Sequence, residues 1–311
     1  MIRADRLSKN FGKTEAIRDV SFCVEKGEIL GFLGPNGSGK TTTMRILSCH
    51  TPPTKGTARI AGYDVTRQSR EVRRKIGYMP ETFGLYDDMT VRSYLDFIGE
   101  LKGLKHTLRR ERVNLVMEQT GLKPVSERLI RNLSKGYRQR AGLAQSLVGD
   151  PEILILDEPT VGLDPAQIKE IRTLILSMKG VKTIVLSTHI LQEVAAICTR
   201  IAIVSLGRIA AIGAPEELAK KLAPEERLAV LAGGNQDAIT RILKDISGVL
   251  SVKTQQTDSP HQMYHVHVKK GCDIRKDISA SLIKAGCDLY EMYPLGMSLE
   301  EVYMNVVMGG E

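Results

Sequence analysis

Tryptophan and cysteine are scarce in this sequence. It has 311 residues, no tryptophan and five cysteines, which are scattered and form no C-x-x-C pair. A disulfide framework or a zinc site needs cysteines at paired, regular spacings, so the sequence indicates neither. We interpret the cysteines as reduced thiols of a cytosolic protein.

Long apolar runs are also lacking. None approaches the roughly 18 residues that mark a membrane-spanning helix, and the opening MIRAD has no apolar core typical of a signal peptide. With 42% hydrophobic and 26% charged residues, the composition is typical of a globular protein that buries its own core. If the protein serves transport, another chain must supply the membrane pathway.

Positive charge is concentrated in one segment. The formal net charge is +8, and residues 67–140 hold all of this excess, with 17 Lys/Arg against 9 Asp/Glu. Such a surface can face nucleic acid, anionic lipid or nucleotide phosphates. The alternative is an ordinary solvated helical surface.

Apolar patterning predicts an α/β domain over residues 1–222. Alternating residues predict strands within residues 1–25, a helix is expected over residues 41–48, and residues 88–148 have helical spacing. Short apolar strands that alternate with helices favour a mainly parallel sheet. The apolar runs lie at residues 29–33, 153–156, 183–186 and 201–204.

A second domain is predicted over residues 223–311. Prolines and many charges at residues 213–227 indicate a helix and linker before it. The elements that follow have the order βαββαβ, typical of a small ferredoxin-like α+β domain, and residues 298–307 predict a closing helix. The strands are expected at residues 228–232, 249–257, 262–268 and 288–294, with helices at residues 236–246 and 273–286.

A glycine-rich stretch at residues 34–41 reads GPNGSGKT and matches the phosphate-binding pattern G-x-x-x-x-G-K-[ST]. It follows an apolar run and precedes a predicted helix, which is the context that this motif requires. Backbone N–H groups and Lys40, which we expect to be exposed, can bind phosphates, and the Thr41 hydroxyl can bind Mg²⁺. The predicted nucleotide-binding residues are Gly34, Pro35, Asn36, Gly37, Ser38, Gly39, Lys40, Thr41 and Thr42.

Two carboxylates follow a later apolar run. Residues 153–160 read ILILDEPT, which predicts a strand that ends at a metal site. Asp157 is expected to hold Mg²⁺, and Glu158 is expected to orient and polarise the attacking water. A buried strand followed by surface acids is the alternative.

Three shorter motifs surround this acidic pair. Residues 133–140 read LSKGYRQR and open a predicted helix with Ser134 at its N-cap, which taken alone is typical of an ordinary capped helix. Residues 162–165 read GLDP, and the strand at residues 183–186 is followed by the triplet STH, which ends at His189. A lone histidine is usually exposed or has its hydrogen bonds satisfied within the fold, so His189 indicates a functional site only together with the other motifs.

In this order and spacing, the motifs resemble the nucleotide-binding domain of ABC transporters over residues 1 to about 222. The resemblance implies a P-loop NTPase cassette with a mainly parallel sheet, an N-terminal antiparallel β subdomain and a helical subdomain. His189 would contact the γ-phosphate and act with Lys40 and Glu158 in catalysis, and Phe11 would stack on adenine, unless it is a core residue near a turn. Two chains would sandwich ATP head to tail. The second chain would then contribute Ser134 and Gly136. Asp164, in a segment that resembles the family's D-loop, is a further predicted nucleotide-binding residue.

The match departs from the family at Lys135 and Tyr137, where Gly and Gln are usual, and at Glu81, where Gln is usual. The family's Gln contacts Mg²⁺ or the attacking water and begins the loop that touches the membrane subunit. A carboxylate can hold a hard cation such as Mg²⁺; the alternative is that Glu81 stays in solvent. With the closing SLEEVY at residues 298–303, these variants resemble the type-2 exporter branch, which includes multidrug-type and gliding-motility-type ATPase subunits.

The resemblance therefore implies an ATPase subunit of an ABC exporter, with ATP and Mg²⁺ as cofactors. Its partners would be an integral membrane permease and a second copy of the chain or a close homologue, at the cytoplasmic face of the membrane. The main alternative is a soluble ABC ATPase that acts on ribosomes or DNA, but such chains carry two cassettes or a long coiled coil. We therefore expect no nucleic-acid partner. An importer ATPase is a third interpretation, although importers often carry a β-rich extension.

Overall fold

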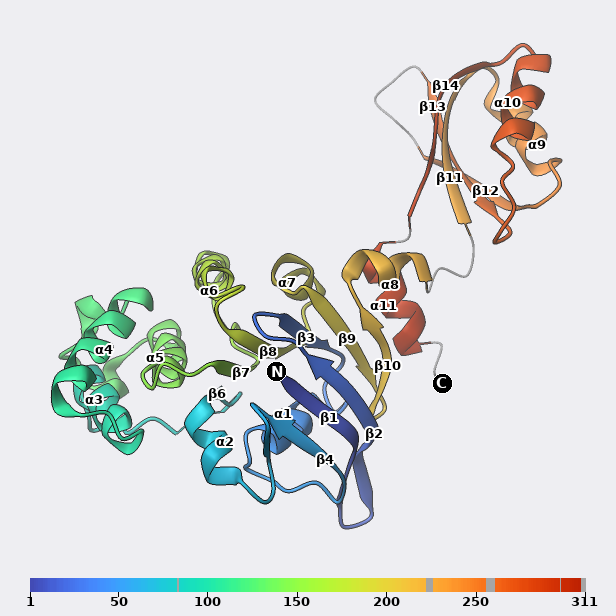
Figure 1. Ribbon diagram of the computed structural model, residues 1–311. Coiled ribbons are helices and arrows are strands. Elements are labelled where there is room, and N and C mark those ends of the chain that lie inside the picture. The colour runs from blue at the N-terminus through green and yellow to red at the C-terminus, as the bar shows by residue number, and fades with distance from the viewer. Residues whose placement is uncertain (83, 222–225, 256–260, 297, 309–311) are drawn as a thin grey trace. The chain divides into compact units, whose positions relative to one another are not determined.

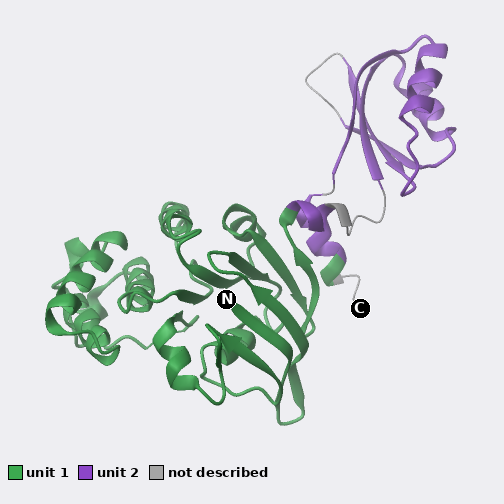
Figure 2. Ribbon diagram, viewed as in Figure 1, with its two compact units in different colours: residues 1–215, 306–311 green, residues 216–305 purple. Residues whose placement is uncertain are grey.

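The computed structural model describes residues 1–82, 84–221, 226–255, 261–296 and 298–308. The chain forms two compact units (Figure 2). One comprises Met1–Pro215 and the end of the chain from Val306, and the other comprises Glu216–Asn305. The predicted boundary between residues 222 and 223 lies outside the described residues.

An antiparallel sheet opens the first unit, as the alternating pattern near the N-terminus predicts. Val20, Phe22 and Val24 are buried, whereas the residues between them are exposed, because successive side chains of a strand point to opposite faces. The strand order is β2-β1-β4-β5. The strands are β1 (Ile2–Phe11), β2 (Thr14–Val24), β4 (Lys55–Ile60) and β5 (Tyr63–Asp64).

A six-stranded sheet forms the centre of the first unit, in the order β10-β9-β3-β8-β7-β6. All neighbouring strands are parallel except β10, which is antiparallel to β9. The inner strands β3, β7 and β8 are buried from end to end, which explains their continuous apolar runs. The strands are β3 (Ile29–Leu33), β6 (Ile76–Met79), β7 (Ile153–Asp157), β8 (Thr183–Thr188), β9 (Arg200–Ser205) and β10 (Arg208–Gly213).

Three helices that contact one another form a helical subdomain beside β6 (Figure 1). They are α3 (Val91–Leu101), α4 (His106–Gln119) and α5 (Lys135–Leu147), with 3₁₀ turns at Lys123–Val125 and Ile130–Asn132. Within the described ranges, no helix is long and apolar enough to cross a bilayer. The other helices of this unit or at its ends are α1 (Lys40–Leu47), α2 (Ser69–Lys75), α6 (Pro165–Ser177), α7 (Leu191–Ile197), α8 (Pro215–Lys221) and α11 (Leu299–Met308).

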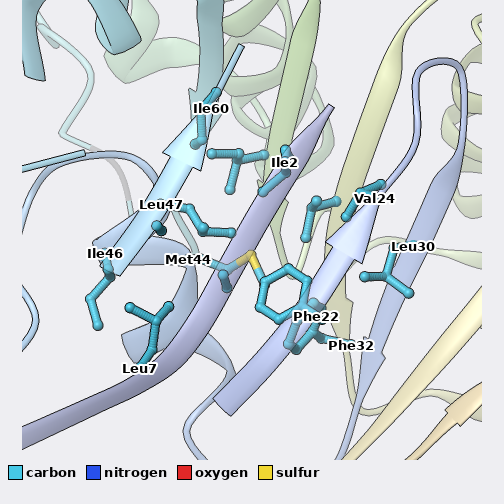
Figure 3. Packing of buried hydrophobic residues seen from close by; sticks show 14 of the residues in the cluster. Ile2, Leu7, Phe22, Val24, Leu30, Phe32, Met44, Ile46, Leu47 and Ile60 are labelled. Carbon is cyan, nitrogen blue, oxygen red and sulfur yellow. The ribbon is translucent and has the colours of Figure 1, made fainter. Parts of the chain in front are cut away.

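A hydrophobic cluster joins the two sheets and α1. The rings of Phe22 and Phe32 meet edge to face with centroids 5.0 Å apart, and Met44 and Leu47 of α1 are fully buried in the same cluster (Figure 3). The helix that follows the phosphate loop is therefore held against the core along its buried face.

The second unit has the predicted βαββαβ order. Its four strands form an antiparallel sheet in the order β12-β13-β11-β14, and both helices pack on one hydrophobic cluster with it. The predicted strand at residues 249–257 is observed to Gln255, and the next two residues lie outside the described ranges. The elements are β11 (Glu226–Gly233), α9 (Gln236–Lys244), β12 (Val249–Gln255), β13 (Gln262–Val268), α10 (Arg275–Lys284) and β14 (Asp288–Pro294).

Because each unit has its own hydrophobic cluster, a fragment of residues 1–221 should fold and bind ATP without the second unit. We expect its ATP affinity to lie within roughly threefold of that of the full chain, which is under about 1 kcal/mol. Isothermal titration calorimetry and thermal unfolding of both proteins test this. A soluble, cooperatively unfolding fragment that fails to bind ATP would contradict the independence of the units.

Candidate active site

Strand pairing brings three predicted motifs to one edge of the parallel sheet. β8 pairs with β3 on one side, where Thr188 lies opposite Leu33, and with β7 on the other, where Ser187 lies opposite Asp157. Because the carboxyl ends of parallel strands lie at the same edge, the phosphate loop after β3, the acidic pair and His189 meet there. The structure thus gathers the catalytic residues that the sequence predicts for one chain.

The phosphate loop needs glycine at several positions. Gly37 and Gly39 have φ values of 79° and 103°, in the left-handed region that favours glycine. A Cβ on Gly34 would lie 2.3 Å from the carbonyl oxygen of Val204, so no larger residue fits there. Of the other predicted nucleotide residues, Asn36 is exposed, Pro35, Thr41 and Thr42 are half-buried, and Ser38 is buried.

Lys40 is buried, so our prediction that it is exposed is wrong. Only 5% of its surface is accessible, because the side chain folds back over the loop. Its Nζ donates hydrogen bonds to the carbonyl oxygens of Gly34 at 2.8 Å and Pro35 at 3.1 Å, and lies 3.8 Å from Oε1 of Glu158. Burial lowers the pKa of Lys40, and the carboxylate of Glu158 opposes this shift. The ammonium group is therefore held within the loop, where phosphates would bind.

Asp157 is fully buried, and one of its oxygens lacks a partner. Oδ1 accepts hydrogen bonds from the hydroxyls of Ser187 and Thr41, the latter at 3.3 Å, whereas Oδ2 has no hydrogen-bond partner in the described part of the chain. Burial raises the pKa of Asp157. A buried, unsatisfied carboxylate oxygen beside a threonine hydroxyl fits Mg²⁺, which proteins hold through few carboxylates together with substrate phosphates. Accordingly, the described residues include no cluster of three or more His, Cys, Asp or Glu able to hold a metal.

Glu158 occupies a strained backbone position. Its φ is +50°, a left-handed conformation that costs a non-glycine residue on the order of 1–2 kcal/mol. Its N–H donates to the carbonyl oxygen of Ser187 at 3.1 Å, and its Oε2 lies 3.0 Å from Nδ1 of His189. Burial raises the pKa of Glu158, while His189 and Lys40 oppose that shift. A buried carboxylate is therefore fixed between the lysine of the phosphate loop and the histidine.

Residues 133–140, which resemble the signature motif of the ABC family, form the start of α5, and Ser134 is its N-cap, as predicted. The Ser134 hydroxyl accepts a hydrogen bond from the N–H of Tyr137 at 3.4 Å. A Cβ on Gly136 would lie 2.6 Å from the side-chain amide of Gln167, which would have to move to make room for it. Asp164 caps α6 by accepting from the N–H of Gln167 at 2.9 Å. Within one chain, these residues order the starts of two neighbouring helices.

Gln139 links α5 to the acidic pair, and the sequence analysis missed it. Its buried side chain donates through Nε2 to the carbonyl oxygens of Glu158 at 3.3 Å and Pro159 at 2.9 Å. A signal was available, because Gln139 lies on the buried face of the predicted helix, where an amide needs a hydrogen-bond partner. Its partners could not be read from the sequence, since they lie 19 and 20 residues away.

Two other predicted residues lie at the periphery. Phe11 is 50% exposed at the end of β1, with the Lys9 ammonium 5.2 Å from its ring centroid, so the alternative of a core residue is wrong. Glu81 is exposed just after β6, yet its charge adds to the raised pKa of Asp157 and opposes the lowering of the pKa of Lys40. The adenine-stacking role of Phe11 and the Mg²⁺-binding role of Glu81 therefore remain predictions.

Comparisons with known proteins agree with this geometry. Residues 17–161 match the ABC transporter family. The "Daunorubicin resistance ATP-binding protein DrrA3" of Streptomyces coeruleorubidus is 30% identical over 306 residues, which are 98% of this chain and 95% of that protein. The chain belongs to the ATP-binding proteins of ABC transporters. The predicted fold class and the predicted ABC ATPase subunit are thereby confirmed.

Two further proteins are similar to this ABC ATPase over most of its length. The "Probable multidrug ABC transporter ATP-binding protein YbhF" of Escherichia coli (strain K12) is 39% identical over 229 residues, 73% of this chain but only 39% of that longer protein. A dimeric post-hydrolysis structure of the ATP-binding cassette MJ0796, bound to ADP and Pi, has a TM-score of 0.64 at 25% identity, covering 69% of this chain and 98% of that one.

Glu158→Gln should stabilise the protein at neutral pH and lose this advantage in acid. Burial raises the folded-state pKa of Glu158 above its ordinary value of 4.5. The contribution of Glu158 to the free energy of unfolding is therefore fully present below the pKa that its carboxyl has in the unfolded chain. This contribution is lost as the pH rises through the higher pKa of the folded protein. Glutamine carries no charge, so the variant escapes this loss.

Melting temperatures measured from pH 4.5 to pH 8 test this expectation. The melting temperature of the variant should exceed that of the wild type by an amount that grows with pH. Each kcal/mol of difference in the free energy of unfolding corresponds to about 2–4 °C in a chain of this size. Asp157, whose pKa is also raised, is present in both proteins, so the part of its titration that is independent of Glu158 cancels in the difference. An advantage that is absent at pH 8, or equal at all pH values, would contradict the argument.

Proposed function

We propose that this chain binds ATP with Mg²⁺, hydrolyses it as half of a two-chain sandwich, and drives export through separate membrane subunits at the cytoplasmic face of the membrane. The observation that carries the proposal is the buried carboxylate of Glu158, which lies 3.8 Å from Lys40 and 3.0 Å from His189. Relatives named for multidrug transport and daunorubicin resistance support the export direction.

The geometry supports a different role for each of these residues within one chain. Lys40 and the loop N–H groups bind the β- and γ-phosphates, and Phe11 stacks on adenine. Asp157 and Thr41 would hold Mg²⁺, which when bound would supply positive charge to offset the charge on the transferred phosphoryl group. Glu81, whose charge reaches Asp157, completes this side of the site.

Glu158 and His189 serve the water molecule. Glu158 orients it and accepts its proton, and burial, which raises the pKa of this carboxylate, makes it a better base at neutral pH. The Nδ1 atom of His189 lies 3.0 Å from Oε2 of Glu158, which leaves Nε2 as the ring nitrogen that would contact the γ-phosphate. The reaction then rests on positioning and charge stabilisation, without a covalent intermediate.

A second copy of the chain, or a close homologue, completes the site. Ser134 and Gly136 begin the signature helix, where backbone N–H groups and the helix dipole favour phosphate. With Asp164, they would reach the nucleotide held by the other chain. The dimeric, nucleotide-bound cassette MJ0796 supports this arrangement.

The membrane partner is expected at a groove between the parallel sheet and the helical subdomain. This groove, of about 390 Å³, is lined by residues of α2, β6, α3 and α5 and by Pro80, Thr82 and Gly84 of the loop that follows Glu81. Tyr86 continues that loop, is 54% exposed and packs edge to face on Tyr94 and Phe97. Arg73 and Lys102 at the groove belong to the basic segment, and Lys/Arg near anionic lipid gain about 1 kcal/mol each.

Glu158→Gln should leave ATP binding intact and reduce turnover by more than about 100-fold, because an amide cannot take up the proton of water. ATP-bound dimers of the variant should accumulate and elute earlier in gel filtration. Steady-state ATPase activity close to that of the wild type would remove Glu158 from this role and with it the proposed mechanism.

A tagged chain should co-purify with an integral membrane protein from detergent-solubilised membranes. Tyr86→Ser should weaken this association at least about tenfold, or 1.4 kcal/mol, since the exposed ring lies in the contact loop. Tyr293→Ser, at an exposed tyrosine of the second unit, is the matched control. Tight binding of RNA or DNA at physiological salt, without any membrane subunit, would favour the soluble class of ABC ATPase instead.

A further inference from the structure

A buried carboxylate lies behind the active site and has no part in the reaction as described. Glu193, in the first turn of α7, is only 3% exposed. Its Oε1 accepts a hydrogen bond from the hydroxyl of Thr160 at 2.6 Å, and its Oε2 accepts one from the hydroxyl of Thr188 at 2.9 Å. Both threonines are buried as well, at 3% and 0% exposure.

These two threonines belong to the segments that carry the catalytic groups. Thr160 lies two residues after Glu158, in a turn closed by the hydrogen bond from the N–H of Val161 to the carbonyl oxygen of Glu158 at 3.2 Å. Thr188 immediately precedes His189, and its hydroxyl also accepts from the N–H of Ile190 at 3.0 Å. The Thr188 side chain therefore fixes the backbone on both sides of the histidine.

The chemistry of a carboxylate makes this link directional. A carboxylate oxygen accepts and a threonine hydroxyl can donate, and here each hydroxyl donates to one oxygen of Glu193. A buried charge is costly unless it is hydrogen-bonded, which favours the arrangement in which both bonds form together. The left-handed backbone of Glu158 also needs surrounding contacts to hold it, since such strain relaxes when its supports are lost.

We propose that Glu193 is a positioning residue whose carboxylate clamps Thr160 to Thr188 and so keeps Glu158 and His189 within hydrogen-bond distance of each other. We call these three side chains the Glu193 clamp. The inference rests on the proposed function, because it assumes that Glu158 and His189 perform the hydrolysis. Phosphate binding by Lys40 does not pass through the clamp, so loss of the clamp should lower kcat and leave ATP affinity unchanged.

Thr160→Val and Thr188→Val each remove one arm of the clamp at nearly constant volume. We expect each to lower kcat about tenfold, with an unchanged dissociation constant for ATP. The double variant should lose little more than either single variant, because one missing arm already separates the two segments. Thr160→Ser keeps the hydroxyl and should restore most of the activity.

Thr120→Val is the matched control. Thr120 is also a buried threonine, at 2% exposure, and its hydroxyl bonds to the carbonyl oxygen of Val116 at 2.7 Å at the end of α4. Its replacement should lower the melting temperature much as the clamp variants do, while kcat remains that of the wild type. A kcat for Thr160→Val equal to that of the wild type, or an equal fall in kcat for Thr120→Val, would overturn the clamp.

A spectroscopic readout separates the clamp from the proposed function. The protein has six histidines, so the imidazole signals of His189 can be assigned in NMR spectra by comparison with His189→Gln. Thr160→Val should shift these signals because Nδ1 loses its fixed partner, even if the wild type proved unable to hydrolyse ATP. That failure would refute the proposed function, whereas unchanged His189 signals in Thr160→Val would refute the clamp.

Discussion

The parallel pairing of β8 with both β3 and β7 is the interaction on which the active site depends. It sets the end of β8 opposite the ends of its neighbours. Thr188 lies opposite Leu33 of β3, and the preceding residue, Ser187, lies opposite Asp157 of β7. Because backbone hydrogen bonds fix the register, the sheet sets the points at which the loop, the acidic pair and the histidine segment begin.

Burial shifts the pKa values of the charged groups in this site, and it also costs free energy because these charges lose their contact with water. Burial raises the pKa values of Asp157 and Glu158 and lowers that of Lys40, so each charged form is disfavoured there. Opposite charges, two hydroxyls and backbone carbonyls offset part of this penalty without removing it. Active sites commonly combine such desolvated groups with backbone strain, and here Glu158 has both.

Sequence reasoning succeeded where chemistry imposes a local pattern. The glycines of the phosphate loop, the apolar strands and the βαββαβ tail each follow from rules that act over a few residues, and the structure contains all of them. It failed for Lys40, because the pattern does not say that the side chain folds back on its own loop. Gln139 and Glu193 escaped notice because their partners lie up to 33 residues away and only the folded chain brings them together.

The path of the chain between the two units has a consequence for how the protein can change. The chain leaves the first unit after Pro215 and returns to it at Val306. The second unit is therefore an insertion with two connections rather than an appended tail. Exchanging or removing it therefore requires a new junction at both connections, whereas the hydrophobic cluster behind the phosphate loop has no residue in that unit and keeps all of its own.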